Sequence, residues 1–203
     1  NCGLVGLKVS RGRIPFGPQG PDPWWGFDSL HALSRTVRDS AALLDATAGD
    51  YPQHLTRLPV PERPYLEETQ RDPGRLRVAF SYDPGLGRSL HAENRRAIEA
   101  TTAALDRLGH EVVEVHLPLP TETFLDAYVS LVSADVAGTL RRAAALVGRA
   151  VTSDDVELAT WMLAKLGEAQ SAADAAVAFA TMQLFSRQWL GWSSSFDVLL
   201  TPT

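Results

Sequence analysis

The chain has 203 residues, of which 45% are hydrophobic, and a formal net charge of −5 with no long run of one sign. This composition fits a globular protein with a buried core, in one large domain or two small ones, and disfavours a nucleic-acid or anionic-membrane partner. A single cysteine excludes an internal disulfide, and no apolar run approaches the roughly 20 residues that cross a bilayer, so a reducing cytoplasm is the expected compartment.

The predicted elements begin with a short apolar strand over residues 4–9, followed by a loop over residues 10–28. Glycines and prolines in this loop break both helix and sheet. Aromatic side chains bury large apolar areas, so four of them should hold the loop against a core or a pocket: Phe16, Trp24, Trp25 and Phe27. Residues 36–48 carry apolar side chains at helical spacing and predict a helix.

Residues 50–74 are rich in proline and polar side chains. They predict an extended segment that crosses a surface, with a flexible linker as the alternative. Beyond them, apolar residues alternate over 75–82 and 111–117, and helical spacing fills 91–108. A strand, a helix and a strand in this order form a βαβ unit, whose strands are expected to be parallel and joined by a right-handed crossover.

The remainder is predicted to be helical until a final strand over residues 198–200, with a first helix over 122–145. Two further helices are predicted to begin near Thr152 and at Ser171, because each of these residues is followed three positions later by an aspartate, as in a capping box. The last helix should bury a stripe of apolar residues: Val177, Ala180, Leu184 and Trp189.

Several familiar chemical motifs are missing from the sequence. The Gly3-Leu-Val-Gly-Leu-Lys8 run lacks the spacing of a phosphate-binding loop. The histidines have no helical pair and no carboxylate at ligand spacing, so no metal site is expected. There is no Gly-x-Ser-x-Gly nucleophile elbow, and Cys2, which has no matching histidine, is expected to be a buried structural residue.

Three sequence blocks together are specific. The first is Cys2-Gly-Leu-Val-Gly-Leu-Lys-Val-Ser-Arg-Gly-Arg13, the second runs from His31-Ala-Leu-Ser-Arg-Thr-Val-Arg-Asp39 to Gly49, and the third is Phe196-Asp-Val-Leu-Leu-Thr-Pro-Thr203. Their content, order and separation resemble the amidase signature family, and within it bacterial amidases that act on aminohexanoate oligomers. The resemblance covers essentially the whole chain, although Val9 and His31-Ala32 depart from the family's usual proline and Gly-Pro.

The resemblance implies a hydrolase of carbon–nitrogen amide bonds that forms an acyl-enzyme, on an α/β fold with a mixed β-sheet flanked by helices. Members of the family use a Ser–Ser–Lys triad and a Gly/Ser-rich oxyanion loop, with no metal or organic cofactor. Those residues are expected upstream of Asn1. This chain should then hold an incomplete sheet and no catalytic residue, and should be inactive alone, since Lys8 matches a later, structural lysine of the family.

The resemblance also places the loop over residues 19–31 beside the nucleophile, as one wall of the acyl pocket. Trp24 and Trp25 are therefore candidate substrate-binding residues, and the alternative is that they only hold the loop to the core. His31 is a third candidate, for which loop-to-helix packing or hydrogen bonding is the favoured interpretation. Arg35 and Asp39 are expected to form a structural pair or cap contacts.

The chain is interpreted as a single portion of an amidase fold, divided into residues 1–74, the βαβ unit at 75–118 and a helical region with the final strand at 119–203. Its expected partner is a small-molecule amide, without nucleic acid or membrane. Exposed edges and apolar faces favour aggregation or a homo-oligomer. A non-catalytic amidase-like binding domain is the main alternative, and a nucleotide-binding α/β domain is disfavoured because no Gly-rich phosphate loop is present.

Overall fold

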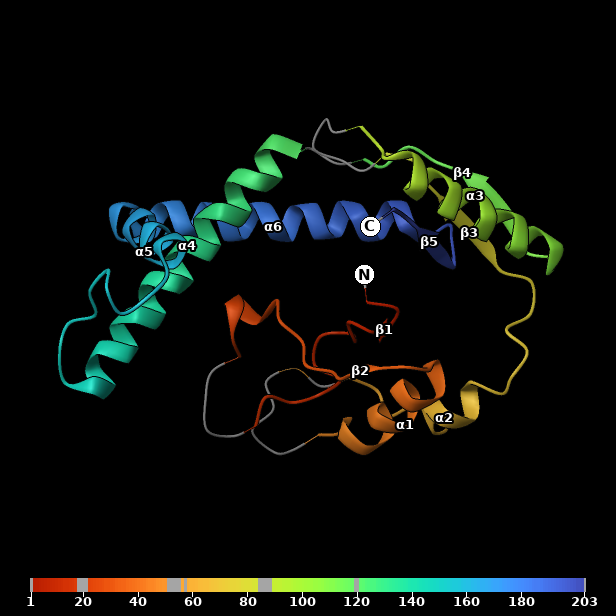
Figure 1. The fold of residues 1–203 in the computed structure, drawn as a ribbon, viewed down its shortest axis with the longest axis horizontal. Coiled ribbons are helices and arrows are strands. Elements are labelled where there is room, and N and C mark those ends of the chain that lie inside the picture. The colour runs from red at the N-terminus through yellow and green to blue at the C-terminus, as the bar shows by residue number, and fades with distance from the viewer. Residues whose placement is uncertain are drawn as a thin grey trace. The chain divides into compact units, whose positions relative to one another are not determined.

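A computed structural model describes residues 2–17, 22–50, 56, 58–83, 89–118 and 121–202 (Figure 1). The chain divides into two compact units, Asn1–Asp72 and Pro73–Thr203. The boundary falls in the proline-rich segment, next to the predicted start of the βαβ unit. In the described part of the chain, no helix is long and apolar enough to span a membrane.

In the part of the first unit that the structure describes, there are two short strands and three helical segments. In chain order they are β1 (Val5–Gly6), the 3-10 turn η1 (Trp24–Gly26), β2 (Leu33–Ser34), α1 (Val37–Thr47) and α2 (Tyr65–Glu68). Strands β1 and β2 pair antiparallel. The predicted strand over residues 4–9 is therefore shorter than expected, and β2 was not predicted because two residues carry no readable alternation.

Helix α1 organises the first unit. Thr36 caps its N-terminus, where the Thr36 hydroxyl accepts a 3.0 Å hydrogen bond from the Asp39 amide. The buried side chain of Leu44 packs with Val9 and Ile14 to form the core of this unit. The core is small, so polar contacts must help to hold the surrounding segments in place.

The proline-rich segment is fixed to α1 by hydrogen bonds rather than being a free linker. The Asp45 carboxylate accepts hydrogen bonds from the backbone amides of Tyr65 (2.7 Å) and Leu66 (2.8 Å). Asp45 thereby caps the N-terminus of α2. Arg13 donates to the Pro59 carbonyl at 2.8 Å, and its guanidinium lies 5.9 Å from the Tyr65 ring. The extended path is thus interrupted by a helical turn, and residues 51–55 and 57 lie outside the described part.

The second unit contains the predicted βαβ unit. Strands β3 (Arg77–Phe80) and β4 (Glu111–Glu114) are parallel, and helix α3 (Ala92–Arg107) connects them. Strand β5 (Val198–Leu200) pairs with the other edge of β3, also in parallel, so the sheet order is β4-β3-β5. Burial on both sides explains why Val78 and Ala79 of the central strand are apolar.

Arg77 joins all three strands at one end of the sheet. Its side chain donates to Glu111 (3.1 Å) on β4 and to the Ser195 carbonyl (3.1 Å) before β5. Its backbone amide donates to the Asp197 carboxylate at 2.7 Å, and the Asp197 amide returns a bond to the Arg77 carbonyl at 2.9 Å. Asp197, which belongs to the third sequence block, therefore has a structural role in sheet registry.

Three long helices complete the second unit: α4 (Thr121–Val147), α5 (Leu158–Ala169) and α6 (Ala172–Ser193). Helix α4 packs against both α5 and α6 (Figure 1). At the crossing of α4 and α5, the Gly167 backbone lies directly against the backbone of Ser133. Gln170 locks this crossing, because its amide donates to the Ser130 carbonyl (2.9 Å) and the Ser133 hydroxyl (3.1 Å).

Two helix predictions need correction and one is confirmed. The Thr152–Asp155 contact forms, but it closes a turn that also includes Arg149, and α5 begins only at Leu158. On α6, Val177 and Leu184 are 68% and 59% exposed, so the predicted stripe is not buried. The buried line of α6 is instead made of small residues, Ala175 and Ala178. The Ser171 capping box is confirmed.

Candidate substrate-binding residues

Trp24 and Trp25 form η1, a tight turn with an unusual backbone. Their φ angles are +52° and +57°, a left-handed region that bulky residues rarely adopt. The Phe27 amide closes the turn by donating to the Trp24 carbonyl at 2.9 Å. The two side chains are 38% and 42% exposed, so neither indole is buried in a core. Among proteins, backbone strain of this kind clusters at active sites and ligand clamps, so both residues stay candidates for substrate contact.

Two further side-chain features of this loop are a cation–π contact and a buried hydroxyl group. The Arg11 guanidinium lies 4.8 Å from the Phe27 ring, a cation–π contact that holds the end of the turn. The Ser29 hydroxyl oxygen is buried, and it has no hydrogen-bond partner among the described residues. A buried hydroxyl usually has a partner, so Ser29 is a polar group that a ligand or another polypeptide segment could satisfy. Sequence reasoning gave no signal for it.

His31 lies where the loop meets α1. Its Nε2 atom is 2.9 Å from the Ser40 hydroxyl, which fixes the ring against the helix. His31 also lines a cavity of about 300 Å³, whose other lining residues are Ile14, Leu30, Ala32, Leu43 and Thr47. Neither Trp24 nor Trp25 lines this cavity, so the structure does not bring the three candidates together in one pocket.

The His31–Ser40 pair does not form a hydrolytic dyad. Ser40 is 3% exposed and sits inside α1, so a substrate carbonyl cannot reach its oxygen. A histidine that acts as a base is normally oriented by a third group, and in the described ranges no carboxylate bonds to His31. The pair is a packing contact that fixes the orientation of the His31 ring.

The other residues singled out in the sequence blocks lie at the surface or take part in a helix cap. Cys2 is exposed, so the prediction of a buried cysteine is wrong; it precedes β1 and is outside the core. Lys8 is also exposed. Arg35 and Asp39 form no ion pair in the structure as described; Asp39 takes part in the helix cap through its backbone amide. No group of three metal-ligating side chains gathers within the described ranges.

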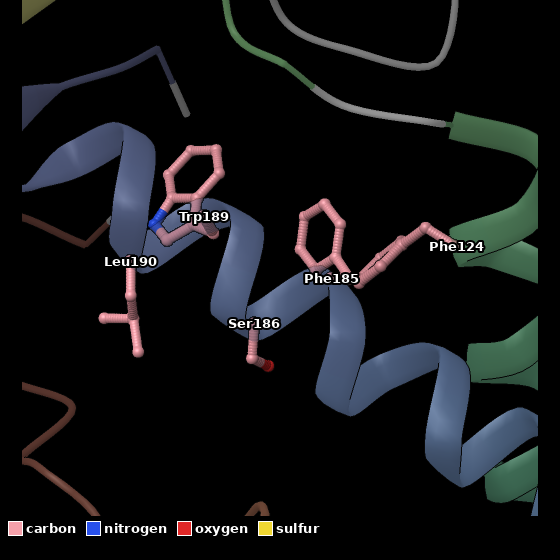
Figure 2. Close-up of a pocket in the computed structure, with 5 residues that line it drawn as sticks. All are labelled: Phe124, Phe185, Ser186, Trp189 and Leu190. Atoms are coloured by element: carbon pink, nitrogen blue, oxygen red, sulfur yellow. The ribbon is translucent and has the colours of Figure 1, made fainter.

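The second unit has an apolar cavity of about 480 Å³ between α4 and α6. Its lining consists of Phe124, Phe185, Ser186, Trp189 and Leu190 (Figure 2). Figure 2 shows the Phe124 ring reaching from α4 toward Phe185 on α6, and their ring centroids are 4.8 Å apart. No lining residue carries a charge. Sequence reasoning had assigned Trp189 to a buried stripe and had not identified this cavity.

An aromatic row continues from the cavity to the sheet. Phe185, Trp189, Trp192 and Phe196 follow one another with centroid distances of 6.2, 5.1 and 5.7 Å. The Arg77 guanidinium lies 5.0 Å from the Phe196 ring at the end of the row. The cavity wall is therefore tied through packed rings to the start of β3 and β5.

Comparison with known proteins gives a consistent result. The family model described as Amidase matches residues 1–203. The chain is 32% identical over 209 residues to a 6-aminohexanoate-cyclic-dimer hydrolase of Pseudomonas sp. (strain NK87), which covers 100% of this chain and 42% of that enzyme. A hydrolase of the same name from Paenarthrobacter ureafaciens is also 32% identical, with the same coverage. The chain thus spans less than half the length of these relatives.

Solved structures agree with the sequence matches. The structure of a 6-aminohexanoate cyclic dimer hydrolase complexed with substrate matches with a TM-score of 0.84 and 31% identity, over 96% of this chain and 41% of the other. A bacterial aryl acylamidase of the amidase signature family shares the fold, with a TM-score of 0.78 at 18% identity. The α/β architecture is therefore part of the amidase signature fold, and the chain belongs to the amidase family.

Proposed function

We propose that the intact protein hydrolyses carbon–nitrogen amide bonds through an acyl-enzyme. Residues 1–203 would supply scaffold and part of the substrate pocket, while the nucleophile comes from polypeptide outside this sequence. The observation that carries the proposal is the family match over the whole chain. The single Ser–His contact found among the described residues has its serine buried, which supports a source of the nucleophile elsewhere.

The substrate is proposed to be an uncharged amide. The hydrolases that are 32% identical are named for a cyclic dimer of 6-aminohexanoate. Trp24 and Trp25 support this class, because two exposed indoles offer large apolar faces. His31 is the third proposed contact, through the apolar cavity that it lines. Metal and organic cofactors are not part of the proposal.

The intact protein is further proposed to act on a small molecule in a bacterial cytoplasm. A net charge of −5 without basic clusters supports a small-molecule partner rather than nucleic acid. A bacterial cytoplasm is proposed, in keeping with one cysteine and bacterial relatives. Self-association is supported by an exposed apolar line on α5, made of Leu158, Met162 and Leu166.

The test uses the longest natural form of the enzyme and a series of linear and cyclic amides. Trp25→Phe keeps an aromatic ring, whereas Trp25→Gly removes the indole and tolerates the left-handed backbone. We expect Trp25→Gly to lower kcat/KM selectively for bulky amides, with Trp25→Phe intermediate. Trp161→Phe on α5 is the matched control, because that indole packs beside Lys165 in the other unit.

Two results would count against this function. An unchanged substrate profile for Trp25→Gly would remove Trp25 from the pocket while leaving amide hydrolysis intact. Amide hydrolysis by the purified 203-residue chain alone would refute the proposed origin of the nucleophile. A long form that binds amides without cleaving them would favour the alternative, a non-catalytic amidase-like binding domain.

A further inference from the structure

We propose that the cavity between α4 and α6 is a binding site for an uncharged small molecule with a flat apolar ring and one N–H donor. Binding at this site needs no hydrolysis and involves residues of the second unit alone. A volume of about 480 Å³ lies within the range of small-molecule sites in proteins.

The lining determines the apolar part of the ligand. Phe124 and Phe185 meet at 4.8 Å with their planes tilted by 52°, and Trp189 lies one turn further along α6 (Figure 2). Aromatic faces and edges of this kind accept another ring in a stacked or edge-on arrangement. The row that continues through Trp192 and Phe196 holds the wall rings in place before any ligand arrives.

The charge of the ligand follows from the absence of counter-charges. Phe124, Phe185, Ser186, Trp189 and Leu190 contain no ionisable group. An ammonium or carboxylate entering the cavity would lose hydration without gaining an ion pair, which is unfavourable. The site should therefore discriminate against charged ligands of the same shape.

Ser186 supplies a hydrogen-bond acceptor at the cavity wall, beside the indole N–H donor of Trp189. Its hydroxyl already donates to the Met182 carbonyl at 2.9 Å, so the proton is engaged within the helix. The oxygen lone pairs remain as an acceptor at the cavity wall. A ligand N–H group would satisfy that acceptor.

The experiment follows the five tryptophan indole N–H signals of the 203-residue chain by NMR during titration with acetanilide. Acetanilide has a flat ring, no charge and one N–H group. We expect a saturable shift of the Trp189 signal with a Kd on the order of 1 mM, as befits a fragment-sized ligand. Trp161, which does not line the cavity, should not respond. Benzoate and benzylammonium should bind at least about 10-fold more weakly than acetanilide.

A pair of ligands and variants tests the role of Ser186. N-methylacetanilide lacks the N–H group, so it should bind several-fold more weakly than acetanilide to the wild-type chain. Ser186→Ala should remove that preference while the aromatic wall stays intact. Phe185→Ala should weaken both ligands about 10-fold. Leu184→Ala is the control, because this neighbouring side chain is exposed and does not line the cavity.

The proposal would be overturned if the Trp189 signal did not move on addition of acetanilide, or if charged ligands bound as tightly as acetanilide. It would also be overturned if Ser186→Ala still preferred acetanilide to N-methylacetanilide. A fourth contrary result would be a Trp189 signal that shifts with protein concentration in the absence of ligand. The last result would assign the cavity to a second copy of the chain. Binding without hydrolysis would support this site and leave the proposed amidase function to its own test.

Discussion

Gly167→Ala should destabilise the packing of α4 against α5. A Cβ atom at this position would overlap the carbonyl of Ser133 and lie 2.9 Å from the backbone nitrogen of Ala134. Ser133 is fully buried, and its hydroxyl and the adjacent Ser130 carbonyl are engaged by Gln170. The clash is therefore with a fixed backbone rather than with the end of a flexible side chain, so relief requires the two helices to move apart.

The expected cost combines two opposing effects. Overpacking a well-filled interior costs ~1–3 kcal/mol, and a backbone overlap belongs at the upper end of that range. Replacing glycine by alanine inside a helix returns up to ~1 kcal/mol of helix propensity. The net loss should be about 2 kcal/mol, which corresponds to a Tm that is roughly 4–8 °C lower for a chain of this size.

Gly138→Ala provides the matched control, because it makes the same change inside α4. There the added Cβ meets only the guanidinium of Arg142 at 3.5 Å, an ordinary contact. This variant should be more stable than wild type by up to ~1 kcal/mol. Thermal and urea unfolding followed by far-ultraviolet circular dichroism would measure both variants. If Gly167→Ala is as stable as Gly138→Ala, the tight crossing described above is wrong.

Three further predictions concern polar contacts. The pKa of Asp155 is held well below its ordinary value of 3.8, first by the hydrogen bond from Arg149 and then by those from Thr152. A lowered pKa stabilises the fold above pH 3.8, so the Tm advantage of wild type over Asp155→Asn should be constant from about pH 7 to 5 and shrink below 3.8. An advantage that persists undiminished at pH 2 would contradict this. Asp45→Ala should speed hydrogen exchange at the Tyr65 and Leu66 amides, for a local loss of ~1 kcal/mol, and unchanged exchange would show that Asp45 does not hold α2. Ser171→Ala should cost ~1 kcal/mol in urea unfolding, whereas Ser194→Ala at the other end of α6 should be nearly neutral; equal losses would argue against the capping box.

Sequence reasoning succeeded where local chemistry determines structure. Alternating apolar residues identified β3 and β4, and the strand–helix–strand order predicted their parallel pairing. The pairing of Ser171 with Asp174 located the start of α6. It failed where the same local signal serves another purpose. Thr152 and Asp155 form the expected contact, yet Arg149 draws the aspartate into a turn and the helix begins later. A capping signature specifies a contact but not the element that follows it.

The candidate site was only partly predictable, because its geometry depends on long-range packing. Trp24 and Trp25 could be identified as exceptional aromatic residues in a loop, but their left-handed backbone could not be. His31 was recognised through the second block, while its partner Ser40 lies nine residues away across the start of a helix. The cavity on α6 could not be predicted, because Phe124 belongs to α4, which is far from α6 in the sequence. No pattern within α6 indicates that α4 packs against it.

The position of β3 in the middle of the sheet has a consequence for biosynthesis. Its edge toward β4 can close as soon as residue 114 leaves the ribosome, whereas its other edge must wait for β5, and the Arg77–Asp197 bond spans 120 positions. During that interval, an apolar strand is left with one set of backbone groups unpaired, a state prone to mispairing. Slow synthesis of the three long helices would prolong the exposure, and a chaperone that shields β3 should raise the yield of folded protein.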